Sequence, residues 1–163
     1  MQKTSIFWFR RDLRLDDNKG LSEALKADEK VIPIFIFDRD ILDHLEDKYD
    51  RRVDYIHQAL EKINLELKEF GSSLLTFHGK PLDVFKQLEK DFEIKSVFCN
   101  RDYEPSAIKR DDEVKDFLNS KDIEFFDFKD QVIFEKSDVV KDNGEPYTVY
   151  TPFSSKWKKL LTE

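Results

Sequence analysis

The chain has 163 residues, of which 39% are apolar, and it carries a net charge of −7 at pH 7. A chain of this size can bury a hydrophobic core of its own, but its acidic charge argues against a surface that grips a nucleic-acid backbone, which needs clustered Lys and Arg. The single cysteine, Cys99, excludes a disulfide framework and a cysteine-rich zinc site. The chain also has no apolar run near the ~20 residues that span a bilayer. These two features predict a cytoplasmic protein with no membrane partner.

Short apolar runs alternate along the chain with segments of helical periodicity. The apolar runs are typical of strands covered on both faces and lie at 6–9, 31–37, 74–77, 97–99 and 123–128. The helices that we expect between them run from about 18 to 27, 53 to 70, 81 to 90 and 105 to 119. The second of these ends at Gly71, because glycine is favoured just past a helix C-terminus. This alternation predicts an α/β fold: a Rossmann-like, five-stranded parallel sheet with helices on both faces.

The pattern changes after Phe128. Residues 130–150 combine one short apolar stretch with an Asn-Gly turn at 143 and 144. Residues 151–163 have the pattern of a short basic helix, for which this chain offers no packing partner. We therefore expect the α/β part of the chain to end near residue 130.

Polar side chains gather where the apolar runs end. Ligands of open α/β sheets bind beyond the carboxyl ends of the strands, and the residues at these ends are Arg10, Arg11, Asp12, Asp38, Arg39 and Asn100 to Glu104, with Phe35 and Phe37 beside the second end. Guanidinium groups, carboxylates and aromatic walls would suit a flat heteroaromatic ligand. The same residues would equally serve as Arg–Asp ion pairs that brace loops or a domain contact, and their spacing leaves both interpretations open.

The common signatures of nucleotide, metal and hydrolase sites are missing. The four glycines form neither a dinucleotide fingerprint nor a P-loop. The histidines at 44, 57 and 78 lack the spacing of metal ligands, so we expect no metal, and no serine sits in a nucleophile elbow. The sequence thus shows no self-contained catalytic site.

Several motifs, in order along the chain, resemble the DNA photolyase and cryptochrome family. They are Phe-Trp-Phe-Arg-Arg-Asp-Leu-Arg-Leu-Asp-Asp-Asn at 7–18, Val-Ile-Pro-Ile-Phe-Ile-Phe-Asp at 31–38, Asn-Arg-Asp-Tyr-Glu-Pro at 100–105 with Lys-Arg-Asp at 109–111, Asp-Gln-Val-Ile-Phe at 130–134, and Pro-Tyr-Thr-Val-Tyr-Thr-Pro-Phe at 146–153 with Trp157 after it. An ordered set that spans nearly the whole chain is far more specific than any one motif.

The resemblance implies that residues 1–130 are the N-terminal α/β domain of a photolyase-like protein. Residues 131–163 would then be a connector towards a C-terminal helical domain that this chain lacks. In the family, that second domain binds FAD and the flipped pyrimidine dimer, and reduced flavin splits the dimer under blue light. The implied parent is a deoxyribodipyrimidine photolyase, a carbon–carbon lyase whose partners are damaged DNA and its own FAD-binding domain. The fragment by itself would be inactive.

In many family members this domain holds an antenna chromophore that harvests light. The positions that match the flavin or deazaflavin antenna site of the family are Arg10, Phe35, Asp38, Arg51 and Asp102. Folate-type members carry an Asn-Glu pair where this chain has Ser106 and Ala107, which argues against folate because an acceptor for the pterin ring is lost. An FMN, FAD or deazaflavin antenna, or an empty pocket, remains open.

Three other functions are compatible with the same residues. A cryptochrome, a blue-light receptor without repair activity, would have a similar N-terminal domain. A Rossmann-like nucleotide- or flavin-binding module would share the fold and the polar strand ends. In a structural domain, the chain's own side chains would fill the pocket.

Overall fold

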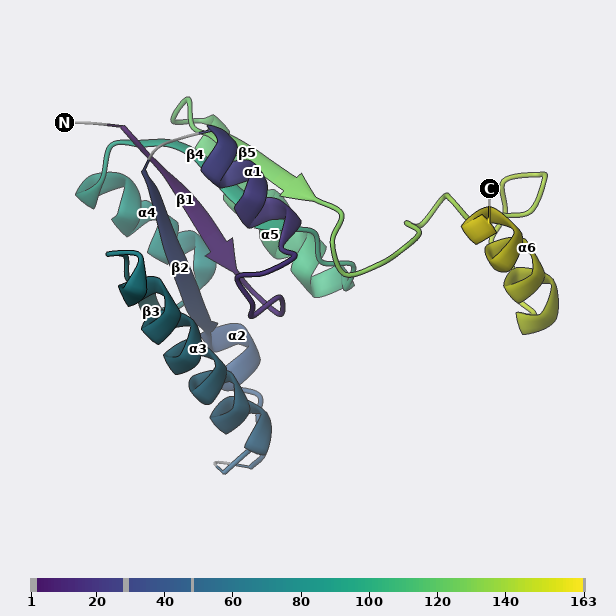
Figure 1. Cartoon of the computed structure of the whole chain (residues 1–163), viewed down its shortest axis with the longest axis horizontal. Coiled ribbons are helices and arrows are strands. Elements are labelled where there is room, and N and C mark those ends of the chain that lie inside the picture. The colour runs from purple at the N-terminus through teal and green to yellow at the C-terminus, as the bar shows by residue number, and fades with distance from the viewer. Residues whose placement is uncertain (1–2, 28–29, 48, 163) are drawn as a thin grey trace. The chain divides into compact units, whose positions relative to one another are not determined.

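The computed structural model describes residues 3–27, 30–47 and 49–162. The chain divides into two compact units, Met1–Asp130 and Gln131–Glu163. All five strands found in these described residues belong to the first unit and form one parallel sheet in the order β3-β2-β1-β4-β5 (Figure 1). The strands are β1 (Thr4–Phe9), β2 (Val31–Asp38), β3 (Leu75–Gly79), β4 (Ile94–Asn100) and β5 (Glu124–Phe128). The five-stranded parallel sheet predicted from the apolar runs is therefore confirmed.

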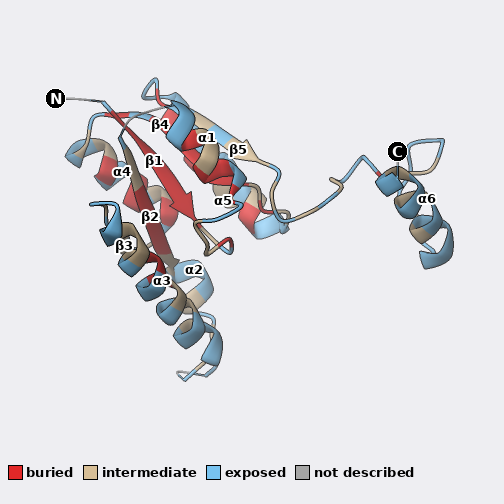
Figure 2. Ribbon diagram, in the orientation of Figure 1, coloured by how far each residue is buried: buried red, intermediate tan, exposed pale blue. Residues whose placement is uncertain are grey.

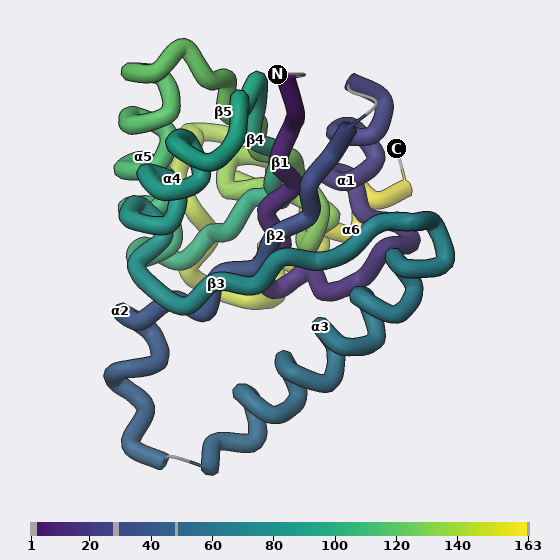
Figure 3. The backbone as a smooth tube through the Cα atoms, turned by 90° about the vertical axis from the view of Figure 1, so that its left-hand side faces the viewer, coloured from purple at the N-terminus to yellow at the C-terminus, as the bar shows by residue number. Residues whose placement is uncertain are grey.

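Four helices of the first unit cover the two faces of the sheet, as predicted. Helices α1 (Lys19–Ala27) and α3 (Arg51–Glu69) lie on one face, and α4 (Pro81–Asp91) and α5 (Pro105–Asn119) lie on the other (Figure 3). Both α4 and α5 begin with a proline, which lacks the N–H that a first helical turn leaves unpaired. After α3, Gly71 has a φ of 69°, a left-handed conformation in which a Cβ would be strained.

The core is two-layered because side chains alternate along the strands. All six residues of the central strand β1 are buried (Figure 2). Ile6 and Trp8 pack with α4 and α5, whereas Phe7 and Phe9 pack with α1 and α3. Rings dominate both layers: Phe7 meets Phe9 edge-on, with ring centroids 4.6 Å apart.

One short helix was not predicted. Helix α2 (Arg39–Leu42) follows β2 directly, and the side chain of Asp38 caps it by accepting a hydrogen bond from the backbone N–H of Asp40 at 3.0 Å. Four residues are too few to show a helical period in the sequence.

The second unit contains one helix, α6 (Tyr150–Thr162), where a short basic helix was predicted; Glu163, the last residue of that prediction, lies outside the described residues. Trp157 of α6 packs edge-on against Phe134, with ring centroids 5.5 Å apart. The predicted turn is present, because Gly144 has a φ of 82° and Val140 bridges to Pro146. The role of residues 131–163 as a connector stays a prediction.

Candidate functional site

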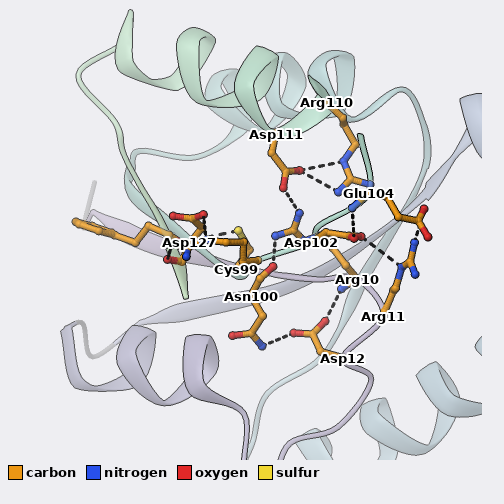
Figure 4. A network of polar contacts seen from close by, with 12 residues as sticks. Arg10, Arg11, Asp12, Cys99, Asn100, Asp102, Glu104, Arg110, Asp111 and Asp127 are labelled. Carbon is orange, nitrogen blue, oxygen red and sulfur yellow. Dashed lines mark hydrogen bonds and ion pairs between the residues drawn. The ribbon is translucent and has the colours of Figure 1, made fainter. Parts of the chain in front are cut away.

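The strand order reverses between β1 and β4, which is where open α/β sheets bind their ligands. The loop after β1 meets the loop after β4 at this point, and the polar residues that follow both strands form one network (Figure 4). The sequence predicted these side chains at the strand ends. The structure adds which partner each of them takes.

Arg10 is at the centre of the network, and its side chain is only 6% exposed. Its guanidinium donates hydrogen bonds to the carboxylate of Asp111 in α5 and to the backbone carbonyl of Asn100 (Figure 4). It also lies over the ring of Trp8, with Cζ 5.0 Å from the ring centroid. The Nε of Arg10 is buried and has no hydrogen-bond partner among the residues that the structure describes.

Arg110 reaches the same ring and the same carboxylate. Its Cζ is also 5.0 Å from the Trp8 centroid, and its Nη2 lies 2.9 Å from Asp111 Oδ1. Two guanidinium groups thus share one carboxylate and one indole. Arg110 and Asp111 were not among the predicted site residues, although both lie in the Lys-Arg-Asp motif at 109–111.

Asp102 is buried and pairs with the neighbour of Arg10. Arg11 Nε lies 3.3 Å from Asp102 Oδ2, and Arg11 Nη2 lies 2.6 Å from Glu104 Oε2. The hydrogen bond to Glu104 contributes most to raising the pKa of Arg11. Asp102 is 7% exposed, but Arg11 is 56% exposed, so water screens this pair.

A second, fully buried set of contacts ties α1 to β4. The Asn100 side chain donates to the carboxylate of Asp12 and, over 2.8 Å, to Asn18 Oδ1, and it accepts from the backbone N–H of Gly20 at 2.8 Å. Asn18 in turn accepts from the N–H of Leu21 at 3.1 Å, which caps α1. A Cβ on Gly20 would lie 2.7 Å from Asn100 Oδ1 and 3.1 Å from the Cys99 backbone carbon, so only glycine allows this approach.

The other three predicted residues lie around β2 and α3. Phe35 is 7% exposed and packs under α3 with Leu60 and Ile63. Asp38 ends the same strand three positions later, so period-two alternation places it on the α4/α5 side. Arg51 is exposed in the first turn of α3. The structure therefore brings Arg10 and Asp102 to the β1–β4 edge and distributes Phe35, Asp38 and Arg51 around the end of β2.

The electrostatic state of two groups limits the chemistry of this edge. Partial burial raises the pKa of Asp38, and the hydrogen bond from Asp40 and the charge of Arg110 oppose that rise. Burial raises the pKa of the Cys99 thiol to about 12, so Cys99 stays protonated and is no nucleophile at neutral pH.

Within residues 3–27, 30–47 and 49–162, no group of three or more His, Cys, Asp or Glu is arranged to hold a metal ion. No helix of this described part has the length and apolar character needed to cross a bilayer.

A protein-family model described as DNA photolyase matches residues 5–163, which is nearly the whole chain. The chain belongs to the DNA photolyase family. A deoxyribodipyrimidine photo-lyase of Synechococcus is 33% identical to it over 153 residues, which are 94% of this chain and 31% of that protein. Cryptochromes match as well, among them cryptochrome-1 of Anopheles gambiae, which is 30% identical over 162 residues, 94% of this chain and 30% of that protein.

Solved photolyase structures share the fold. The class III photolyase of Agrobacterium tumefaciens superposes with a TM-score of 0.85 and 28% identity, covering 100% of this chain and 32% of that chain. An archaeal photolyase of Sulfolobus tokodaii, whose structure holds two FAD molecules and implicates a novel light-harvesting cofactor, gives a TM-score of 0.77 and 27% identity over 98% of this chain and 35% of that chain. The chain thus spans about a third of the length of these photolyases.

Proposed function

We propose that this chain is the antenna-type N-terminal domain of a deoxyribodipyrimidine photolyase. The observation that carries the proposal is the family match over residues 5–163, combined with relatives named as photo-lyases of which this chain spans about a third. The full-length parent would use blue light and reduced FAD to split ultraviolet-induced pyrimidine dimers in DNA. Its FAD would be bound by a C-terminal domain beyond residue 163, and its location would be cytoplasmic.

The residues at the strand ends are compatible with a flat antenna pigment such as FMN, FAD or a deazaflavin. Asp38 and exposed Arg51 would make the polar contacts, since the Asp38 carboxylate has lone pairs beyond the one that caps α2. Phe35 is packed in the core under α3, on the face opposite Asp38, so it would support the strand that carries Asp38 and would not contact the pigment. A bound pigment would supply absorption of light and transfer of the excitation through space, and the protein's share is to bind and orient it.

Arg10 and Asp102 would act on the site indirectly. Their charged groups are paired within the chain, Arg10 with Asp111 and Asp102 with Arg11, so their role would be to hold the β1 and β4 loops in place. The unpaired Nε of Arg10 supports a further acceptor at this edge, because a buried donor without a partner costs about 1–3 kcal/mol. A ligand oxygen or a water molecule would satisfy it.

Pigment analysis of the full-length protein tests the proposal. We expect absorbance and mass spectra of the released small molecules to show FAD and a second pigment. Dimer-containing DNA should be repaired under blue light by the full-length protein and not by residues 1–163. Repair by residues 1–163 alone would contradict the proposal.

The repair assay and one titration distinguish the two other candidates that the relatives and the fold keep open. Full-length protein that binds FAD but repairs no dimers would be a cryptochrome, a class to which the chain is also similar. Titration of residues 1–163 with AMP, ATP, FMN and FAD tests the nucleotide-binding module. Tight adenine-nucleotide binding with no flavin affinity would favour that module over the antenna domain.

A further inference from the structure

Asp130 is the last residue of the first unit. Both of its carboxylate oxygens contact the segment formed by the loop after β1 and the start of α1. Oδ2 lies 2.8 Å from Arg14 Nη2 in an ion pair, and Oδ1 accepts a hydrogen bond from the backbone N–H of Lys19 at 3.1 Å. The side chain is only 4% exposed, although Asp130 lies outside any helix or strand. A loop residue is thus fixed to a segment more than a hundred positions earlier in the chain.

The groups that hold Asp130 are themselves fixed. Arg14 Nη2 also donates to the Asp17 carbonyl at 2.6 Å, and the Arg14 carbonyl accepts from Asn18 Nδ2 at 3.1 Å. Lys19 is the first residue of α1, where the helix dipole favours a negative charge. The carboxylate therefore binds a rigid loop and a helix N-terminus at once.

The contacts of Asp130 are not part of the pairing between β5 and β4. That strand ends at Phe128, whose carbonyl accepts a hydrogen bond from the N–H of Arg101 at 2.7 Å. Only Lys129 lies between the end of the sheet and Asp130. The contacts of Asp130 thus restrain the chain after the sheet has ended and immediately before the second unit begins.

We propose that Asp130 anchors the exit of the polypeptide from the α/β unit. The Arg14 ion pair and the hydrogen bond from Lys19 hold residue 130 against the segment between β1 and α1, so this segment fixes the point at which the chain leaves the α/β unit. This inference does not depend on an antenna pigment.

Distance measurements between spin labels test the anchor in residues 1–163. We would place the labels at Glu61→Cys in α3 and Gln131→Cys directly after the anchor, which are both exposed, while Cys99 is fully buried and out of reach of the label. We expect a narrow distance distribution in the otherwise unchanged protein and a clearly broader one in Asp130→Ala. Equal widths in these two proteins would overturn the proposal.

Two further variants separate anchoring from general loss of stability. Asp127→Ala is the matched control: it breaks the 2.7 Å ion pair with Arg101 at the same edge, three positions earlier, and should leave the width unchanged. Arg14→Gln removes the ion pair but keeps the bond from Lys19, so an intermediate width is expected, and this variant replaces Asp130→Ala if the latter does not fold. Thermal melting that falls equally in Asp127→Ala and Asp130→Ala, with unchanged widths in both, would mean a structural role only.

Discussion

The side-chain amide of Asn100, at the end of β4, donates a hydrogen bond to the carboxylate of Asp12, 88 positions earlier in the chain. Both residues are buried, and Asn100 also serves Asn18 and the N–H of Gly20. Three segments therefore depend on one amide: the loop after β1, the start of α1 and the end of β4. Buried networks of this kind are stable only when every member has its partner.

Asn100→Ala should destabilise the protein strongly. The change leaves the Asp12 carboxylate and the Gly20 N–H without their Asn100 contacts, at a cost of about 1–3 kcal/mol for each buried group left unpaired. Urea unfolding followed by circular dichroism measures the loss. Asn119→Ala, at the exposed end of α5, is the control and should change the free energy of unfolding by less than about 0.5 kcal/mol. Equal stabilities of the two variants would contradict the network.

Gly20→Ala should also destabilise the protein, although alanine is favoured in helices by about 1 kcal/mol over glycine. Its Cβ would lie 2.7 Å from Asn100 Oδ1 and 3.1 Å from the Cys99 backbone carbon, and overpacking of this kind costs about 1–3 kcal/mol. Gly79→Ala is the matched control, since its Cβ would lie 3.4 Å from a Val84 methyl group. We expect a lower melting temperature for Gly20→Ala than for Gly79→Ala, and the reverse order would refute the close approach.

The proposed pigment contacts can be tested without disturbing the fold. Asp38→Asn keeps the cap on α2, because Asn caps helices about as well as Asp, and Arg51 is exposed. Losing one charge-assisted hydrogen bond costs about 1.5–3 kcal/mol, which weakens pigment binding by about tenfold or more. The ratio of second pigment to FAD in full-length protein should therefore fall in Asp38→Asn and in Arg51→Gln.

Arg52→Gln is the control for these two variants. Arg52 is the exposed neighbour of Arg51, and its guanidinium pairs with Asp50 at 2.5 Å. Its ratio of second pigment to FAD should equal that of the unchanged protein. A ratio that falls equally in all three variants, or in none, would remove Asp38 and Arg51 from the proposed site.

The sheet could be predicted because its strands are nearly continuous apolar runs, and where a run is interrupted the prediction fell short. The fourth strand was expected at 97–99 but begins at Ile94, because Lys95 and Ser96 interrupt the apolar pattern. Ser96 is nevertheless buried, and its hydroxyl lies 2.7 Å from that of Ser5 in β1. A polar residue is acceptable in a buried strand when its partner sits opposite, and the sequence alone does not show which residues are opposite.

The site was predictable by position but not by pairing. Polar residues after β1 and β4 lie together at one edge, as their positions predicted, whereas Asp38 and Arg51 lie around the end of β2. That any of these residues bind a pigment stays a prediction. Arg10 pairs with Asp111, which lies 101 positions later in the chain, and Arg14 pairs with Asp130, which lies 116 positions later. From the sequence, several other carboxylates at this edge were equally plausible partners. The opposite directions of Phe35 and Asp38, by contrast, follow from strand alternation alone.

Alkaline pH should destabilise the protein through Cys99. Burial raises the pKa of its thiol from 9.0 to about 12, so the folded state holds the proton that the unfolded state releases above pH 9. Stability from this group is fully present below pH 9 and falls by about 1.4 kcal/mol per pH unit until the pKa of the folded state is reached. Lysines and tyrosines titrate in the same range. The measurement is therefore the difference in the free energy of unfolding between the unchanged protein and Cys99→Ala.

That difference, taken from urea unfolding at pH 8 and pH 10.5, should shift by about 2 kcal/mol in favour of Cys99→Ala at the higher pH. The cavity left by the missing sulfur lowers the stability of the variant equally at both pH values, so it cancels. A thiol reagent offers a second readout, because Cys99 is 0% exposed and should react only after unfolding. A pH-independent difference between the two proteins, together with rapid labelling of the folded chain, would mean that the thiol is neither buried nor held protonated.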